Sequence, residues 1–393
     1  MSYSLSSLVT PVVTPPIADV HGWIADKTFP PERPLLDVAQ AVPVHPPPAE
    51  VLAEVAAQMA RHGLHRYTQI NGLPELRAGL AAHMADSYGG EIVANDVVIT
   101  AGCNQAFCST MQAMLSPGDE VLLPVPYYFN HQMWLEMLGA RAVHIPFNHR
   151  AGGVPDIAEF TRAITSRTRA IVIVTPNNPT GAVYPPALLE ALFELAQANH
   201  LALVIDETYK DFHPAPDTRA HGLFERPDWH DTLVQLFSFS KSYALTGYRV
   251  GSIIGGPPLV AEVTKVQDCT NICAPRVSQV TALAALTHLG PWVREQGDAM
   301  RARVTALTRQ FAGSNSGFEL VAAGAWFAYV RHPFAERTSK EVAREMATEH
   351  GVLCIPGATF GPSQESFVRF AFANLEAEQI PTLMARLHDA AST

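Results

Sequence analysis

The stretch 238–251 reads Ser238-Phe239-Ser240-Lys241-Ser242-Tyr243-Ala244-Leu245-Thr246-Gly247-Tyr248-Arg249-Val250-Gly251. It places one amine, Lys241, beside two serine hydroxyls, and the cation Arg249 follows eight residues later. A lysine that forms a Schiff base with a carbonyl cofactor needs such a setting, because hydroxyls and an arginine can hold a phosphate while the amine holds the aldehyde. The alternative is a strand end followed by a solvated Lys-Ser turn, so other segments must decide between the two.

Two apolar runs upstream of Lys241 end in polar residues. The run 201–206 ends in Asp206, which predicts a buried parallel strand with a carboxylate at the edge where open α/β sheets bind ligands. A buried aspartate needs a positive partner, such as a protonated pyridine nitrogen. The alternative is a helix cap. The run 170–174 leads into an Asn-Pro-Thr-Gly turn that carries Asn178, and an ordinary turn is the alternative there.

Two further segments fit a site for an anionic, aromatic ligand. The run 97–100 is followed by a small-residue turn and then by Cys103 and Asn104. If a helix begins there, its main-chain amides form an anion site. The dinucleotide fingerprint G-x-G-x-x-G is absent from this turn. The aromatic residue Tyr128 follows the next strand-like run at 120–125.

The order and spacing of these motifs resemble the class I/II aminotransferases, which use pyridoxal phosphate. The resemblance spans roughly Asp37 to Arg369, nearly the whole chain. It implies that Lys241 holds the cofactor as an aldimine and also moves the substrate's α-proton. The other cofactor contacts that it implies are those of Cys103, Asn104, Tyr128, Asn178, Asp206, Tyr209, Ser238, Ser240 and Arg249, with His131 behind Asp206.

The resemblance also implies the substrate contacts. Arg369, in an alternating run at 366–372, matches the arginine that grips the α-carboxylate, together with Asn178; a solvent-facing charge is the alternative for a lone strand arginine. Ala41 stands where the family usually has glycine, and its methyl group narrows the approach to the substrate. Arg276 is a candidate for a second substrate carboxylate, and a solvated arginine at a helix start is the alternative.

One tyrosine predicts how the molecule assembles. Tyr67 lies in a Tyr-x-x-x-x-Gly-x-x-x-Leu-Arg element. In the family this tyrosine reaches the partner's phosphate, which implies a homodimer with shared active sites. The alternative is a tyrosine packed inside its own subunit.

Strand-like and helical runs alternate from about residue 50 to 290. Amphipathic helices are expected at 49–61 and 74–87. Alternation of this kind predicts an α/β fold with a mainly parallel seven-stranded sheet covered on both faces, the fold type I of the resembling family. The pattern then changes, so we expect a large cofactor-binding domain at 48–290 and a smaller α+β domain from 1–47 and 291–393. The expected strands are 97–100, 120–125, 141–146, 170–174, 201–206, 233–237 and 249–255.

Composition narrows the class of protein. The chain has 393 residues, 48% of them hydrophobic, and can bury a large core. Its formal charge of −10 argues against a general nucleic-acid surface. Five cysteines without a C-x-x-C pair and no His-Glu-x-x-His predict no metal site, and they favour reduced thiols in the cytoplasm. We expect no targeting segment in the proline-broken residues 1–20, and no run is apolar enough to span a membrane.

The motifs together predict an aminotransferase that exchanges amino acids with 2-oxo acids. One alternative is another reaction of the same fold, such as a carbon–sulfur β-lyase or a synthase, because one cofactor site hosts many reactions. A cofactor-binding regulator without turnover is the other alternative, but the chain has no spare length or basic segment for a DNA-binding domain.

Overall fold

The structure is a computed structural model that describes residues 3–59 and 62–392. Its helices are α1 (Pro16–Gly22), α2 (Ala49–Gln58), α3 (Pro74–Tyr88), α4 (Cys103–Met114), α5 (Phe129–Met137), α6 (Ile157–Ala163), α7 (Pro186–Ala198), α8 (Phe239–Ser242), α9 (Pro257–Asn271), α10 (Arg276–His288), α11 (Gly290–Ala312), α12 (Ser339–Thr348) and α13 (Ile380–Ser392). Its strands are β1 (Leu36–Asp37), β2 (Val97–Thr100), β3 (Glu120–Pro124), β4 (Arg141–Ile145), β5 (Thr168–Val174), β6 (Ala202–Asp206), β7 (Leu233–Ser238), β8 (Gly251–Ile254), β9 (Glu319–Gly324), β10 (Phe327–Arg331), β11 (Val352–Leu353), β12 (Ile355–Pro356) and β13 (Phe367–Phe370).

Seven strands form the large sheet, in the order β2-β8-β7-β6-β5-β3-β4. The pairs among β7, β6, β5, β3 and β4 are parallel, whereas β8 runs antiparallel to both of its neighbours. The predicted fold class is thus confirmed, with β8 as the one reversed strand of this sheet. The expected helix at 49–61 ends at Gln58 in the described part, and its last two residues lie outside the described residues.

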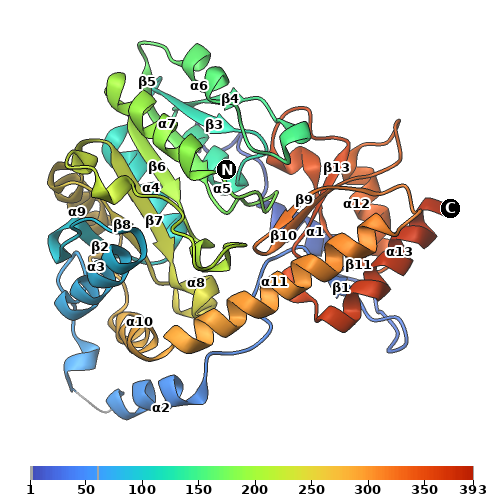
Figure 1. Cartoon of the computed structure of the whole chain (residues 1–393), viewed down its shortest axis with the longest axis horizontal. Coiled ribbons are helices and arrows are strands. Elements are labelled where there is room, and N and C mark those ends of the chain that lie inside the picture. The colour runs from blue at the N-terminus through green and yellow to red at the C-terminus, as the bar shows by residue number, and fades with distance from the viewer. Residues whose placement is uncertain (1–2, 60–61, 393) are drawn as a thin grey trace.

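Helices cover both faces of the large sheet (Figure 1). In β5, Ile171 and Ile173 point into a core that also includes side chains of α3, α7 and α10. The alternate residues Ala170 and Val172 point into a second core, which α4 and α9 close. Burial on both faces explains why these strands are continuous apolar runs rather than alternating ones.

The parallel strands end together at one edge, and this places the polar residues that follow them side by side. Val174, the last residue of β5, pairs in register with Asp206, which ends β6, and Asp206 pairs with Leu236 in β7. Ser238 then ends β7. The carboxyl edge of an open α/β sheet is where such folds bind ligands.

A second, smaller layer packs beside this edge. Strands β12, β13, β10 and β9 form an antiparallel sheet, and β1 pairs in parallel with β11. The long helix α11 runs from the α10 side of the molecule to α13 (Figure 1). The β1 pairing brings the segment after Asp37 next to the large sheet's carboxyl edge, where it contributes to the site described below.

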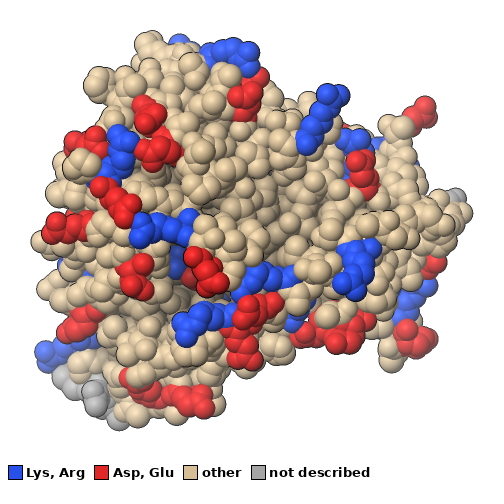
Figure 2. Space-filling model, viewed as in Figure 1, with Lys and Arg blue, Asp and Glu red and all other residues tan. Residues whose placement is uncertain are grey.

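The surface carries charges of both signs. On the face shown in Figure 2, lysine and arginine side chains are interspersed with aspartate and glutamate. Within the described ranges, no helix is both long enough and apolar enough to cross a membrane. The same ranges contain no cluster of three or more His, Cys, Asp or Glu side chains arranged to hold a metal ion.

Candidate active site

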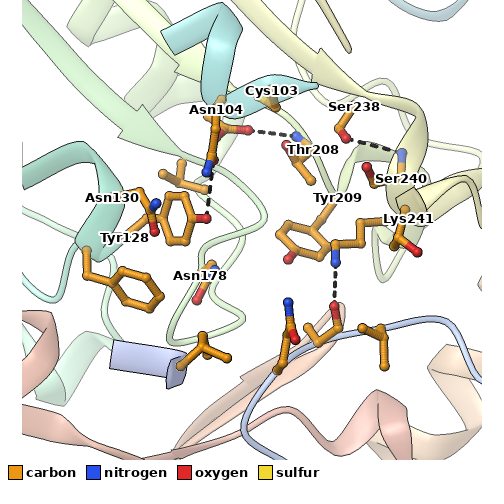
Figure 3. A pocket seen from close by; sticks show the side chains of 18 of the residues that line it. Cys103, Asn104, Tyr128, Asn130, Asn178, Thr208, Tyr209, Ser238, Ser240 and Lys241 are labelled. Carbon is orange, nitrogen blue, oxygen red and sulfur yellow. Dashed lines mark hydrogen bonds between the residues drawn. The ribbon is translucent and has the colours of Figure 1, made fainter. Parts of the chain in front are cut away.

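A pocket of about 500 Å³ opens at the carboxyl edge of the large sheet. Its volume suits a cofactor together with a small substrate. Figure 3 shows side chains from several elements converging on it. It is lined by Pro15, Pro16, Ile17, Gln40, Ala41, Val42, Cys103, Asn104, Tyr128, Phe129, Asn130, Val174, Asn178, Asp206, Thr208, Tyr209, Ser238, Ser240, Lys241, Thr246, Arg249 and Arg369.

Lys241 enters the pocket from the one-turn helix α8. The Ser238 side chain accepts a hydrogen bond from the Ser240 amide at 3.2 Å, which caps this helix directly after β7. The Lys241 amine donates to the carbonyl of Ala41 (Figure 3) and lies 5.3 Å from the centre of the Trp326 ring. Burial, together with the positive charges of Arg249 and Arg369, lowers the pKa of Lys241 to about 7. A large fraction of this amine is therefore neutral near neutral pH.

Asp206, which also lines the pocket, is held in its charged form. One carboxylate oxygen accepts from the Thr208 amide at 3.0 Å, and the other lies 3.5 Å from Nε2 of His131. Burial by itself raises the pKa of Asp206, but the contacts with His131 and Thr208 outweigh burial and hold that pKa below its usual value. The His131 ring stacks on Phe107 with 3.9 Å between ring centres, which fixes it behind the carboxylate.

An anion cradle forms where α4 begins. Gly102 precedes the helix with φ of 87°, so its conformation suits glycine. A Cβ atom at this position would collide with the Arg249 guanidinium. That guanidinium donates to Ser240 Oγ at 3.4 Å and to the Thr246 carbonyl at 2.9 Å. The amides of the first turn of α4, starting at Cys103, carry the partial positive charge of a helix N-terminus.

Two tyrosines flank the space between this cradle and Lys241. The Tyr128 hydroxyl donates to Asn104 Oδ1 at 3.3 Å (Figure 3), and burial raises the pKa of Tyr128 to about 12. Burial also raises the pKa of Tyr209 well above its ordinary value. Both hydroxyls therefore stay protonated near neutral pH and can donate hydrogen bonds to a ligand.

Arg369 is a buried cation on β13 that faces the pocket. It is 2% exposed, and burial lowers its pKa to about 10, so it stays charged near neutral pH. One guanidinium nitrogen donates to Asn178 Oδ1 at 3.0 Å, and the other donates to the Ala39 carbonyl. The rings of Phe327 and Phe360 lie 4.9 and 5.2 Å from its guanidinium carbon. Its Nε atom has no hydrogen-bond partner within the described part of the chain, so the group retains a free donor.

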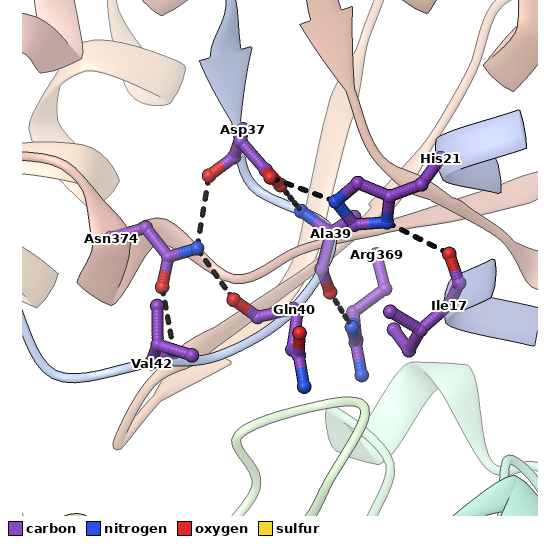
Figure 4. A network of polar contacts seen from close by, with 8 residues as sticks. All are labelled: Ile17, His21, Asp37, Ala39, Gln40, Val42, Arg369 and Asn374. Carbon is purple, nitrogen blue, oxygen red and sulfur yellow. Dashed lines mark hydrogen bonds and ion pairs between the residues drawn. The ribbon is translucent and has the colours of Figure 1, made fainter. Parts of the chain in front are cut away.

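The loop 37–42 contacts both cations of the site, Lys241 through the Ala41 carbonyl and Arg369 through the Ala39 carbonyl, and Figure 4 shows the contact with Arg369. Asp37 accepts from the Ala39 amide at 3.0 Å and pairs with His21 Nε2 at 3.1 Å. Asn374 holds the same loop from the other side, with bonds to the Asp37 and Gln40 carbonyls at 2.9 and 2.6 Å. These contacts hold the loop so that the carbonyls of Ala39 and Ala41 face the two cations of the site.

The structure places nearly all of the sequence-predicted site residues together. All of them line the pocket except Tyr67, Arg276 and His131, and His131 lies behind Asp206 as expected. Tyr67 is 73% exposed, and its carbonyl accepts from Arg276 at 3.2 Å. This arrangement leaves Tyr67 free of its own subunit's pocket, and it leaves Arg276 away from the pocket as well.

Sequence reasoning missed several lining residues. The turn of α1 that contains Ile17, the loop residues Gln40 and Val42, and Asn130 at the start of α5 all reach the pocket. Thr208 could have been inferred, because an aspartate often accepts a bond from the amide two residues later. The remaining residues carry no local signal, since tertiary packing alone brings them to the pocket.

Comparison with known proteins gives the family. Residues 35–387 match the sequence profile described as aminotransferase class I and II. The chain belongs to this family. It is 29% identical to the aromatic aminotransferase ISS1 of Arabidopsis thaliana, covering 95% of this chain and 92% of that protein. It is 30% identical to the arginine–pyruvate transaminase AruH of Pseudomonas aeruginosa, covering 86% and 85%.

A solved structure agrees with the family match. The aspartate aminotransferase of Thermus thermophilus, solved with maleate, superposes with a TM-score of 0.88 at 26% identity, covering 99% of this chain and 100% of that one. The protein is therefore an aminotransferase, and its family uses pyridoxal phosphate. The resemblance inferred from the motifs is confirmed.

Proposed function

We propose that this aminotransferase holds pyridoxal phosphate on Lys241 and exchanges amino groups between amino acids and 2-oxo acids in the pocket at the sheet edge. The observation that carries the proposal is a buried amine with a pKa of about 7 that shares one pocket with a buried carboxylate and two arginines. Such a combination of perturbed groups is typical of catalytic sites.

The residues of the pocket fit the cofactor. A Cβ at Gly102 would collide with the Arg249 guanidinium, so glycine at this position lets that cation lie beside the start of α4, which supports an anion site there. A phosphate in the cradle would accept hydrogen bonds from the main-chain amides of Cys103 and Asn104, from the hydroxyls of Ser238 and Ser240, and from the Arg249 guanidinium. Asp206 would pair with the ring nitrogen, while Asn178 and Tyr209 would donate to the ring's phenolic oxygen and Tyr128 would pack on the ring face.

The chain's own groups account for the chemistry around the substrate. When bound, the cofactor supplies an electron-withdrawing ring that stabilises the charge left by the departing α-proton. Arg369, with Asn178 beside it, holds the α-carboxylate and so fixes which bond at the α-carbon faces the ring. Near pH 7 a large fraction of the Lys241 amine is unprotonated, so its Nζ can take the α-proton and then return it. Asp206 stays ionised and keeps its partner nitrogen protonated.

A comparison of donors and acceptors tests the reaction type. The wild-type protein with pyridoxal phosphate should convert amino donors only when a 2-oxo acid is present, and Lys241→Ala should lose this turnover. Turnover that releases ammonia and an oxo acid without an acceptor would instead show a lyase. The relatives are named for aromatic, arginine and aspartate substrates, so their names do not select one donor for this chain.

We further propose that the active unit is a homodimer with shared sites, built from a large domain at 48–290 and a small domain at 1–47 and 291–393. The exposure of Tyr67 supports this assembly, because a tyrosine that serves the partner's phosphate must project from its own subunit. The five unpaired cysteines are consistent with a cytoplasmic location.

Mixed dimers test the sharing. Lys241→Ala and Tyr67→Ala subunits, each impaired alone, should regain part of the activity when they exchange, because one site of a hybrid keeps both residues. Mixtures that exchange subunits and stay at the level of the separate variants would exclude shared sites.

A further inference from the structure

Several residues that line the pocket are left without a role once the cofactor and the α-carboxylate are assigned. We call Ile17, Gln40, Val42 and Asn130 the side-chain subsite. They come from three separate segments, α1, the loop 37–42 and the start of α5, and all four line the pocket. The pair between His21 and Asp37 ties the first two segments together (Figure 4).

Each charged side chain that lines the pocket already has a partner in the proposed function. These side chains are Asp206, Lys241, Arg249 and Arg369. In the proposed function these groups serve the ring nitrogen, the aldehyde, the phosphate and the α-carboxylate. The side-chain subsite itself consists of two aliphatic side chains and two neutral amides. Among the described lining residues, therefore, no further cation is available for a second carboxylate on the substrate.

Nearby cations are engaged elsewhere. His21 contacts Asp37 at 3.1 Å through Nε2 and the Ile17 carbonyl at 2.8 Å through Nδ1. Arg276 donates to the Tyr67 carbonyl and does not line the pocket. His131 lies against Asp206.

The neutral amides do not replace a cation. The side chains of Gln40 and Asn130 make no hydrogen bond to the rest of the described chain, so each can bind a polar atom of a ligand or a water molecule. An amide donates a hydrogen bond but does not neutralise a charge. A carboxylate moved from water into a partly buried pocket without an opposite charge is strongly disfavoured.

We propose that the side-chain subsite selects monocarboxylates in both half-reactions: amino donors with an uncharged side chain and 2-oxo acceptors without a second carboxylate. The inference rests on the proposed function, because the donor and the acceptor then occupy the same pocket in turn. Pyruvate and the oxo acids of neutral amino acids fit this class, and 2-oxoglutarate and oxaloacetate do not.

Isosteric substrates isolate the effect of charge. With pyruvate as acceptor, kcat/KM should be on the order of a hundredfold higher for asparagine than for aspartate, and for glutamine than for glutamate. With methionine as donor, kcat/KM for pyruvate should exceed kcat/KM for 2-oxoglutarate by a similar factor. An acid that equals or exceeds its amide, or 2-oxoglutarate that equals pyruvate, would overturn the proposal and would point to a cation from a partner subunit.

A matched pair of variants tests the location of the subsite. Ile17→Lys adds a cation to the subsite, whereas Ile17→Met adds similar length without charge. Ile17→Lys should raise the glutamate-to-glutamine ratio of kcat/KM at least about tenfold over wild type, and Ile17→Met should leave it unchanged. An unchanged ratio in Ile17→Lys, with Ile17→Met active, would contradict the assignment.

Binding without turnover separates this proposal from the proposed function. Lys241→Ala loaded with pyridoxal phosphate should report amino-acid binding through a change in cofactor absorbance. It should bind glutamine more tightly than glutamate even if no acceptor supports turnover. If this variant binds glutamine more tightly than glutamate but the wild type shows no transamination, the proposed function would be contradicted and the present inference would not. Binding of glutamate that is as tight as or tighter than binding of glutamine would contradict the present inference.

Discussion

The amine of Lys241 lies in a buried pocket within reach of two arginines. Burial and these two positive charges all disfavour its protonated form, and together they account for a pKa of about 7. The same arginines are the groups proposed to bind the cofactor phosphate and the substrate carboxylate. Each anion that binds would offset one of the charges that keep Lys241 neutral, so ligand binding and the basicity of this amine are coupled.

The first prediction concerns the pH dependence of cofactor capture. Only the neutral amine attacks an aldehyde, and a pKa lowered below the usual lysine value extends the neutral form down to lower pH. The rate at which the cofactor-free protein captures pyridoxal phosphate should therefore rise with pH through about 7 and level off above it. Stopped-flow absorbance measures this rate. An inflection near the ordinary lysine pKa would contradict the environment described for Lys241.

A second prediction concerns Asp206. Asp206→Asn removes the charge that is proposed to keep the ring nitrogen protonated, so kcat should fall on the order of a hundredfold or more while the fold persists. Single-turnover absorbance changes and thermal unfolding measure the two effects. Asp119→Asn is the control, because Asp119 pairs with Arg169 just before β3, at the opposite edge of the same sheet. Half-reaction rates that match the wild type in Asp206→Asn would exclude the role.

The positions of strands and helices were predicted best from the sequence where one face or both faces of the element are buried. All seven strands of the large sheet occur where their apolar runs are, and Asp206 ends its strand as expected. Other elements carry no such periodicity. Helix α8 has only four residues and is capped by the Ser238 side chain. Helix α1 is held at the pocket by the contact between His21 and Asp37, which lie sixteen residues apart in the sequence. Contacts of this kind depend on the folded chain.

The loop 37–42 carries a prediction of its own. Asp37→Ala removes the acceptor for the Ala39 amide and the partner of His21, so the carbonyls that face Arg369 and Lys241 lose their support. The KM for the amino donor should rise about tenfold, because loss of hydrogen bonds to a charged group has roughly this effect, and kcat should change less.

Asp19→Ala is the control for this loop variant. Asp19 lies in the same helix as His21, and its carboxylate pairs with Lys340 rather than with the loop. A KM for Asp37→Ala that equals that of Asp19→Ala would show that the loop holds its position without Asp37.

For the whole molecule, the order of the motifs along the chain was sufficient to predict the fold and the family. Asn178 and Lys241 follow parallel strands and Asp206 ends one, and parallel strands end at one edge, so these three residues had to converge. The contribution of α1 and the loop 37–42 to the pocket could not be predicted in this way, because these segments pack from a second layer. The domain boundaries and the role of Tyr67 in a partner subunit stay predictions, since an interface between subunits leaves no periodic signal within one chain.

Lys241, one of the five lysines of the chain, is the residue that we propose to hold the cofactor. Borohydride reduction of the protein loaded with pyridoxal phosphate, followed by digestion and mass spectrometry, tests this most directly. We expect the mass of the reduced cofactor on the peptide that contains Lys241, and we expect that mass to be lost from the peptide when an amino donor is added before reduction. Label on Lys210 or on another lysine instead, or label that the donor does not remove, would contradict this proposal.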